Sequence, residues 1–248
     1  MNALRQTLLT AFASTLMAGT VSAATLTLNP TADAYLRTDQ PTSPSPNPGT
    51  ATELLVGQVS STTAMRALLS FDLSSIPVNA TVNTVSLVMV QSSEDAGSNT
   101  TITLELHLLT QAFVESQAAW NNAATGTPWT TAGGTFDSAV LSAINVSVRP
   151  SQVPYSLPVN QTWASTSSFV SAVQSAADGS NSIAFLFKDV NETNTGRELI
   201  KFFSKEGTTA PQLTIDYTVA AIPEPSTVGL LMGSVVLTGG IWLRRRSR

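Results

Sequence analysis

The stretch Thr101-Ile102-Thr103-Leu104-Glu105-Leu106-His107-Leu108 decides the fold class of this chain. Its apolar residues occupy every second position and polar residues fill the positions between them. A period of two places successive side chains on opposite faces of an extended backbone, so the stretch predicts a strand with one buried face. The same alternation recurs at 212–219, where three apolar residues alternate with threonine and aspartate.

Similar short runs, rich in Val, Ile, Leu and Thr, are spread along the middle of the chain and separated by turn residues. Four prolines within residues 41–48 make that segment an extended loop, because proline fixes φ and removes the backbone donor. About ten strands joined in this way predict an all-β fold, an antiparallel β-sandwich. The predicted strands are residues 25–28, 34–37, 53–57, 66–73, 81–90, 101–110, 144–149, 182–188, 198–203 and 212–219.

Two segments depart from the strand pattern. Residues 165–177 are predicted to form the one short helix, with Ser or Thr capping its start, an apolar stripe along one face and Asp178-Gly179 ending it. Residues 112–120 could form one or two helical turns.

The two ends differ in composition from the middle. Residues 1–23 read as a secretory signal peptide, with Arg5, an apolar stretch and a small-residue cleavage site at Val21-Ser22-Ala23. Residues 220–248 contain an uncharged run at 228–243 that is long enough, at about 24 Å as a helix, to approach the thickness of a bilayer core. We therefore expect three parts: a signal peptide, a β-sandwich domain at 24–219, and a C-terminal tail with a single transmembrane helix.

The charge of the middle part excludes one class of partner. The whole chain has 12 basic and 16 acidic residues, and five of the basic residues but only one acidic residue lie in the end segments. The middle is therefore clearly acidic and has no basic stripe, so it is not expected to bind nucleic acid. The chain has no cysteine, which excludes a disulfide framework and a cysteine nucleophile.

The tail has three parts in a fixed order. Pro223-Glu224-Pro225 is held extended by its prolines, the apolar run follows, and Arg244-Arg245-Arg246 stands almost at the end. This arrangement resembles the PEP-CTERM sorting signal. The resemblance implies export from a Gram-negative-type cell, anchoring in the inner membrane, and recognition by an exosortase that removes the helix. The protein would then reach the cell surface or the extracellular matrix.

The middle part resembles the DNRLRE family, a jelly-roll-like module of exported bacterial and archaeal proteins. The similarity rests on short motifs: 33–37, 47–49, 54–57, 66–77, 119–122, 126–129, 203–206 and 211–217. It implies a jelly-roll-like sandwich, and some modules of this kind bind acidic polysaccharides.

Five residues are candidates for ligand contacts. Trp120 and Trp129 could stack against sugar rings, although large aromatic residues in sandwiches more often fill the core. Asp33, Asp72 and Asp189 stand near predicted strand ends, where carboxylates can help to bind a structural Ca²⁺, although turn and capping roles explain them equally well.

Other conspicuous residues favour structural roles. The strand alternation puts His107 on the polar face beside Glu105, and Arg66 and Lys205-Glu206 are expected to form ion pairs that fix the sheets. Phe71, Phe185 and Phe187 are expected in the core.

No nucleophile elbow, phosphate loop or histidine metal pair is found in the sequence, so we do not expect an enzyme. We expect instead a carbohydrate-binding or adhesive module on the surface or in the matrix, with an extracellular polysaccharide as its partner. The alternative is a purely structural matrix protein without a specific ligand. A polysaccharide-acting enzyme is a third and weaker hypothesis, because the 15 acidic residues of the middle part supply carboxylate pairs by chance.

Overall fold

The computed structural model describes residues 22–44, 49–150 and 157–219. Within these ranges Ala23–Val219 forms one compact unit with its own core. The predicted sorting motif (Pro223, Glu224, Pro225 and the three arginines), the helix at 228–243 and nearly all of the predicted signal peptide lie outside the described residues. Among the helices of the described part, none is long and apolar enough to cross a membrane.

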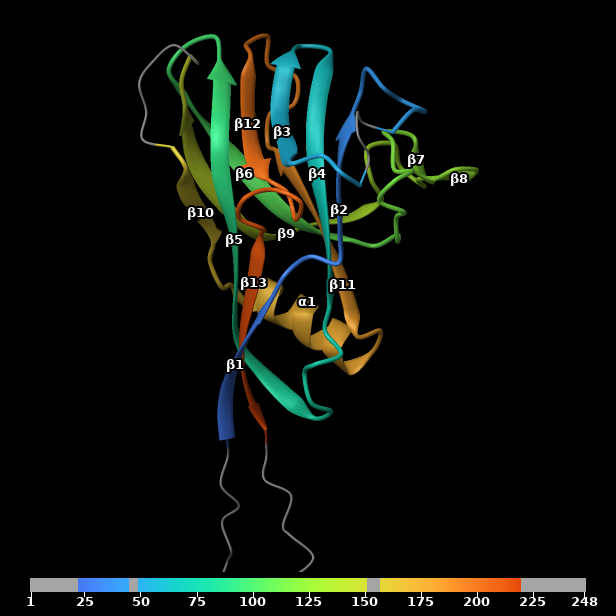
Figure 1. The fold of residues 1–248 in the computed structure, drawn as a ribbon, viewed down its shortest axis with the longest axis vertical. Coiled ribbons are helices and arrows are strands. Elements are labelled where there is room, and N and C mark those ends of the chain that lie inside the picture. The colour runs from blue at the N-terminus through green and yellow to red at the C-terminus, as the bar shows by residue number, and fades with distance from the viewer. Residues whose placement is uncertain (1–21, 45–48, 151–156, 220–248) are drawn as a thin grey trace, which may run out of the picture. The chain divides into compact units, whose positions relative to one another are not determined.

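The unit is an all-β sandwich, as the sequence predicts, built from antiparallel strands and one short helix (Figure 1). The ten predicted strands all form, most of them longer than predicted. They are β1 (Ser22–Leu28), β2 (Ala32–Arg37), β3 (Glu53–Ser60), β4 (Thr63–Asp72), β5 (Ala80–Ala96), β6 (Thr100–Leu109), β9 (Phe136–Val148), β11 (Ser182–Asp189), β12 (Glu198–Phe203) and β13 (Gln212–Val219).

Three further strands were not predicted from the sequence. They are β7 (Asn122–Ala124), β8 (Thr127–Pro128) and β10 (Val159–Trp163). The first two form a small separate hairpin within the segment that joins β6 to β9. The third pairs with the middle of β5, from Val159 opposite Gln91 to Trp163 opposite Leu87.

The main sheet curls back on itself. Its strand order is β1-β13-β5-β12-β3-β4-β11-β6-β9, with β2 attached to β4. Because β10 pairs with β5 and also contacts β9, it brings the last strand of the order next to β5, and the curled sheet encloses an interior. In Figure 1 the β3–β4 and β5–β6 turns lie at the upper end of the unit, and β1 begins and β13 ends at the lower end.

The interior is filled by the apolar face of each strand. Along β6 the predicted alternation is confirmed, because Ile102, Leu104 and Leu106 are buried in the core. Phe71, Phe185 and Phe187 are also fully buried, as expected. A second, smaller cluster of apolar side chains lies on the outer face, where residues 110–136 cover β2, β4 and β11. His107 lies next to Glu105 as predicted, but its imidazole is buried. The strand pairing is irregular beside His107, and the ring of Phe136 lies 4.9 Å from the imidazole.

The helix α1 (Ser167–Asp178) forms where the sequence predicts it. Thr166 caps its start by accepting a hydrogen bond from the Phe169 N–H at 3.1 Å, and Gly179 ends it. Phe169 and Val173 anchor one face in the core. Residues 112–120 form hydrogen-bonded turns at Val114 and no assigned helix, so helical turns are only partly realised there.

Candidate functional site

The three predicted calcium ligands lie in three different places. Asp72 stands opposite Ser182 at one end of the β4–β11 ladder, and Asp189 ends β11 seven residues further on. At about 3.3 Å per residue these two carboxylates are roughly 23 Å apart along the strand, so they cannot bind one ion. Asp72 is exposed and accepts a hydrogen bond from the Ser74 N–H at 2.8 Å, which lowers its pKa and explains it as a turn residue.

Asp33 belongs to an acidic cluster with Glu115 and Glu206, whose oxygens lie within 4.8 Å of one another. Burial raises the pKa of Asp33 to about 7, and the hydrogen bond from the Lys205 N–H, 2.7 Å long, only partly offsets this. The Lys205 ammonium bonds Glu115 at 2.9 Å and also Glu206. This lysine supplies a positive charge inside the cluster, and the predicted Lys205–Glu206 ion pair is confirmed.

The two candidate sugar-stacking tryptophans lie in the segment that covers the outer face of the sheet. Trp129 is buried, and its indole N–H donates to the Ala119 carbonyl at 2.8 Å. The half-buried Trp120 has the Arg66 guanidinium over its ring, 4.8 Å from the centroid. A Cβ at Gly133 would lie only 2.8 Å from the indole of Trp120, so the backbone closes against that ring edge. Both rings therefore pack within this segment.

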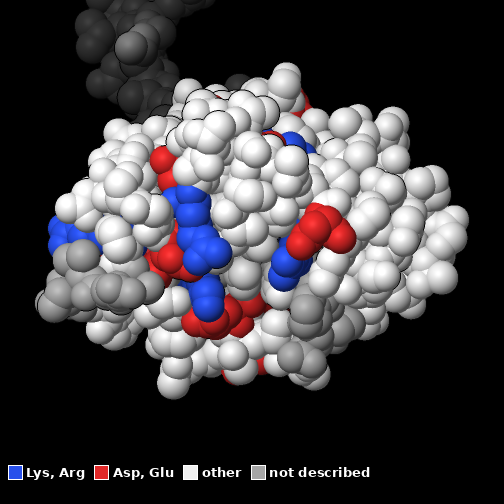
Figure 2. Space-filling model, turned by 90° about the horizontal axis from the view of Figure 1, so that it is seen from above, with Lys and Arg blue, Asp and Glu red and all other residues white. Residues whose placement is uncertain are grey.

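The basic side chains of the described residues are largely neutralised by carboxylates. Figure 2, which views the upper end of the unit, displays Lys and Arg side chains adjoining Asp and Glu side chains. Arg149 lies close enough to Glu94 to offset part of the rise in the pKa of Glu94 that burial causes. The ion pairs are Arg37–Asp39, Arg66–Glu192, Lys188–Glu105, Arg197–Asp95, Lys201–Glu53, and Lys205 with Glu115 and Glu206.

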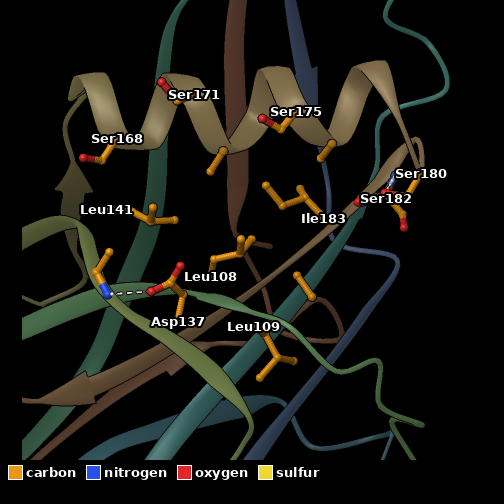
Figure 3. A pocket seen from close by; sticks show the side chains of 14 residues that line it. Leu108, Leu109, Asp137, Leu141, Ser168, Ser171, Ser175, Ser180, Ser182 and Ile183 are labelled. Atoms are coloured by element: carbon orange, nitrogen blue, oxygen red, sulfur yellow. Dashed lines mark hydrogen bonds between the residues drawn. The ribbon is translucent and has the colours of Figure 1, made fainter.

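A groove of about 490 Å³ runs between α1 and the sheet (Figure 3). Its volume is within the range of about 300–1,000 Å³ that is usual for small-molecule sites. The floor is apolar and comes from β6, β9 and β11, through side chains such as Leu108, Leu141 and Ile183. Apolar floors of this kind can pack against the C–H groups of a sugar ring.

The helix supplies the polar wall of the groove. Ser168, Ser171 and Ser175 recur at helical spacing on α1, and all three are exposed. Opposite them lies Asp137, one of whose carboxylate oxygens accepts a hydrogen bond from the Ala139 N–H at 3.0 Å (Figure 3). Hydroxyl groups and a carboxylate around an apolar floor can bind a neutral polyol by hydrogen bonds. The sequence analysis did not find this groove.

Comparison with known proteins agrees with this chemistry. Residues 24–146 match carbohydrate-binding module family 96, a stretch that runs from β1 into β9. The match supports a carbohydrate-binding module, which is a non-catalytic class of protein, and is consistent with the expectation that the chain is not an enzyme. No curated protein sequence matches the chain.

Proposed function

We propose that this protein is an exported surface or matrix protein whose β-sandwich binds a neutral polysaccharide in the groove beside α1. The match to a carbohydrate-binding module family is the observation that carries the proposal. The matched residues include Leu108, Asp137 and Leu141 of the groove, whereas α1 lies beyond the matched range. On this proposal the floor of the groove is common to the family, and the serines of α1 determine which glycan binds.

The charges favour a neutral glycan over an acidic one. Six of the seven basic residues of the described domain are engaged by carboxylates, and Arg149 lies near Glu94. An acidic polymer would have to displace these partners or approach an acidic surface without a free basic patch. A neutral polymer needs neither, because hydroxyl groups can exchange hydrogen bonds with water for hydrogen bonds with Ser171, Ser175 and Asp137.

Blocking the groove tests the proposal. In the fragment 23–219, Ser171→Tyr is expected to weaken binding of a neutral glycan, identified on a glycan array, by tenfold or more in calorimetry, because the ring would occupy the groove. Ser167→Tyr is the matched control: it lies in the same helix, is also exposed, and does not line the groove. Equal binding by the wild type and Ser171→Tyr would place the sugar elsewhere. An array without any bound neutral glycan would favour the purely structural matrix protein.

We further propose that the domain is a DNRLRE-like jelly roll that reaches the surface through its tail. The order of Pro223-Glu224-Pro225, the apolar run and the arginine cluster supports processing by an exosortase after export. Replacing Pro223-Glu224-Pro225 by alanines is expected to trap the full-length protein in the inner membrane, as fractionation and immunoblotting would detect. Replacing Ser226-Thr227 by alanines is the control. Unchanged processing of the Pro-Glu-Pro variant would refute the sorting proposal.

A further inference from the structure

One end of the otherwise apolar interior is polar. In each of three strands, an inward-facing polar residue stands two positions before or after an inward-facing core residue. Val56 of β3 is followed by Gln58, Phe187 of β11 by Asp189, and Ile200 of β12 is preceded by Glu198. All three polar residues are more than nine-tenths buried, at 0%, 2% and 8% exposure respectively.

Strand pairing brings these side chains together. Gln58 lies directly opposite Glu198 in the β3–β12 ladder, and its amide N–H donates to the Glu198 carboxylate at 3.5 Å. The two strands approach closely here, because neighbouring Gly57, with φ of +111°, has no Cβ to collide with the Glu198 carbonyl oxygen. Asp189 ends β11, a strand that also contacts β3, and the pKa of Asp189 is raised to about 6 by burial first and also by the charge of Glu198. We call Gln58, Asp189 and Glu198 the interior polar cluster.

The interior polar cluster has unmet bonding capacity. Asp189 accepts one hydrogen bond, from the Asn191 N–H at 3.1 Å, but its Oδ2 is buried without a partner. The amide oxygen of Gln58 is likewise buried without a partner. None of the seven ion pairs described above includes Asp189 or Glu198, and neighbouring Lys188 and Arg197 are paired with Glu105 and Asp95. Two buried carboxylates without an ion-pair partner carry a large desolvation cost unless a positive charge joins them.

We propose that the interior polar cluster binds a calcium ion through Asp189, Glu198 and the amide oxygen of Gln58. Carboxylate and amide oxygens are the ligands that Ca²⁺ prefers, and two carboxylates match its charge. The ion would hold the upper ends of β3, β11 and β12 together from the inside. This site does not depend on glycan binding in the groove beside α1, which is built from β6, β9, β11 and the helix.

Calcium titration of the fragment 23–219, first treated with a chelator, tests the site. We expect one bound Ca²⁺ per molecule in calorimetry at pH 7.5, and a Tm raised by about 5–10 °C at a concentration near 100 times Kd. Mg²⁺ is expected to bind more weakly, because it demands a smaller octahedral site and dehydrates reluctantly.

Variants locate the ion. Asp189→Asn and Glu198→Gln are each expected to lose the calcium response while keeping a Tm in chelator at least equal to that of the wild type, because each removes a buried charge. Asp33→Asn, which changes the separate Asp33–Glu115–Glu206 cluster, is expected to keep the response. No calcium response in the wild type, a response retained by Asp189→Asn, or a response lost in Asp33→Asn would each overturn the proposal.

Discussion

Replacement of Trp163 by alanine is expected to lower the free energy of unfolding by about 3–5 kcal/mol. The indole of Trp163 is fully buried where β10 completes the curl of the sheet. It packs edge-on against Phe187 at 5.0 Å between ring centroids, and lies 5.9 Å from Phe202. Alanine would leave a cavity among side chains of three strands that cannot collapse independently. A loss of this size is a large part of the 5–15 kcal/mol that is typical of a domain.

Urea unfolding of the fragment 23–219, followed by far-UV circular dichroism, measures this effect. Trp163→Phe should recover much of the loss because it keeps an aromatic ring in the interior. Thr162→Ala is the matched control, since Thr162 is the exposed neighbour on the same strand, and its effect should stay below about 0.5 kcal/mol. A loss below about 1 kcal/mol for Trp163→Ala would mean that β10 contributes little to the core.

The fold was predictable where the period of two is continuous. β6 and β13 alternate strongly, and each lies within one or two residues of its predicted bounds. β10 was missed because five residues are too few to reveal a period, and its only large apolar residue on the inner face is Trp163. The first half of β9 was missed because residues 137–140 are mostly exposed and carry little pattern, although they pair with β6.

The candidate sites were less predictable, because they depend on register and on helix placement. Asp189 was recognised as a possible ligand, but only the β3–β12 pairing brings Gln58 next to Glu198. One signal was present in the sequence: Gln58 and Glu198 fall on the positions that continue the apolar faces of their strands. The serines of the groove gave no such signal, since serine is common throughout this chain and their role depends on how α1 lies on the sheet.

Loss of the Arg66 side chain is the second large effect that we expect, at about 3–5 kcal/mol of unfolding free energy for Arg66→Ala. The guanidinium donates two hydrogen bonds to Glu192, 2.7 and 2.6 Å long, and a third, of 2.8 Å, to the Gly133 carbonyl. It also lies over the rings of Trp120 and Phe136. The sequence predicted an ion pair for Arg66. It did not predict that this side chain of β4 also bonds a second loop, through the Gly133 carbonyl.

Most of the expected loss of unfolding free energy comes from the Glu192 carboxylate that the substitution leaves without a partner. Only 11% of the Arg66 side chain and 15% of the Glu192 side chain are exposed, so Arg66→Ala would leave a poorly solvated carboxylate without a partner. Arg66→Lys should recover part of the loss, because an ammonium restores a positive charge beside Glu192 but cannot form the bidentate pair. The double variant Arg66→Ala/Glu192→Gln should lose less than Arg66→Ala alone, because it removes the orphaned charge.

The matched control is Arg197→Ala. The Arg197–Asp95 pair has a similar N–O distance, 2.6 Å, but half of the arginine side chain is exposed, so water replaces the lost contact and about 0–1 kcal/mol is expected. Equal losses for Arg66→Ala and Arg197→Ala in urea unfolding would contradict the role given to burial. Because Glu192 stands in the loop between Asp189 and Glu198, Arg66→Ala should also weaken calcium binding at the interior polar cluster without removing any of its ligands.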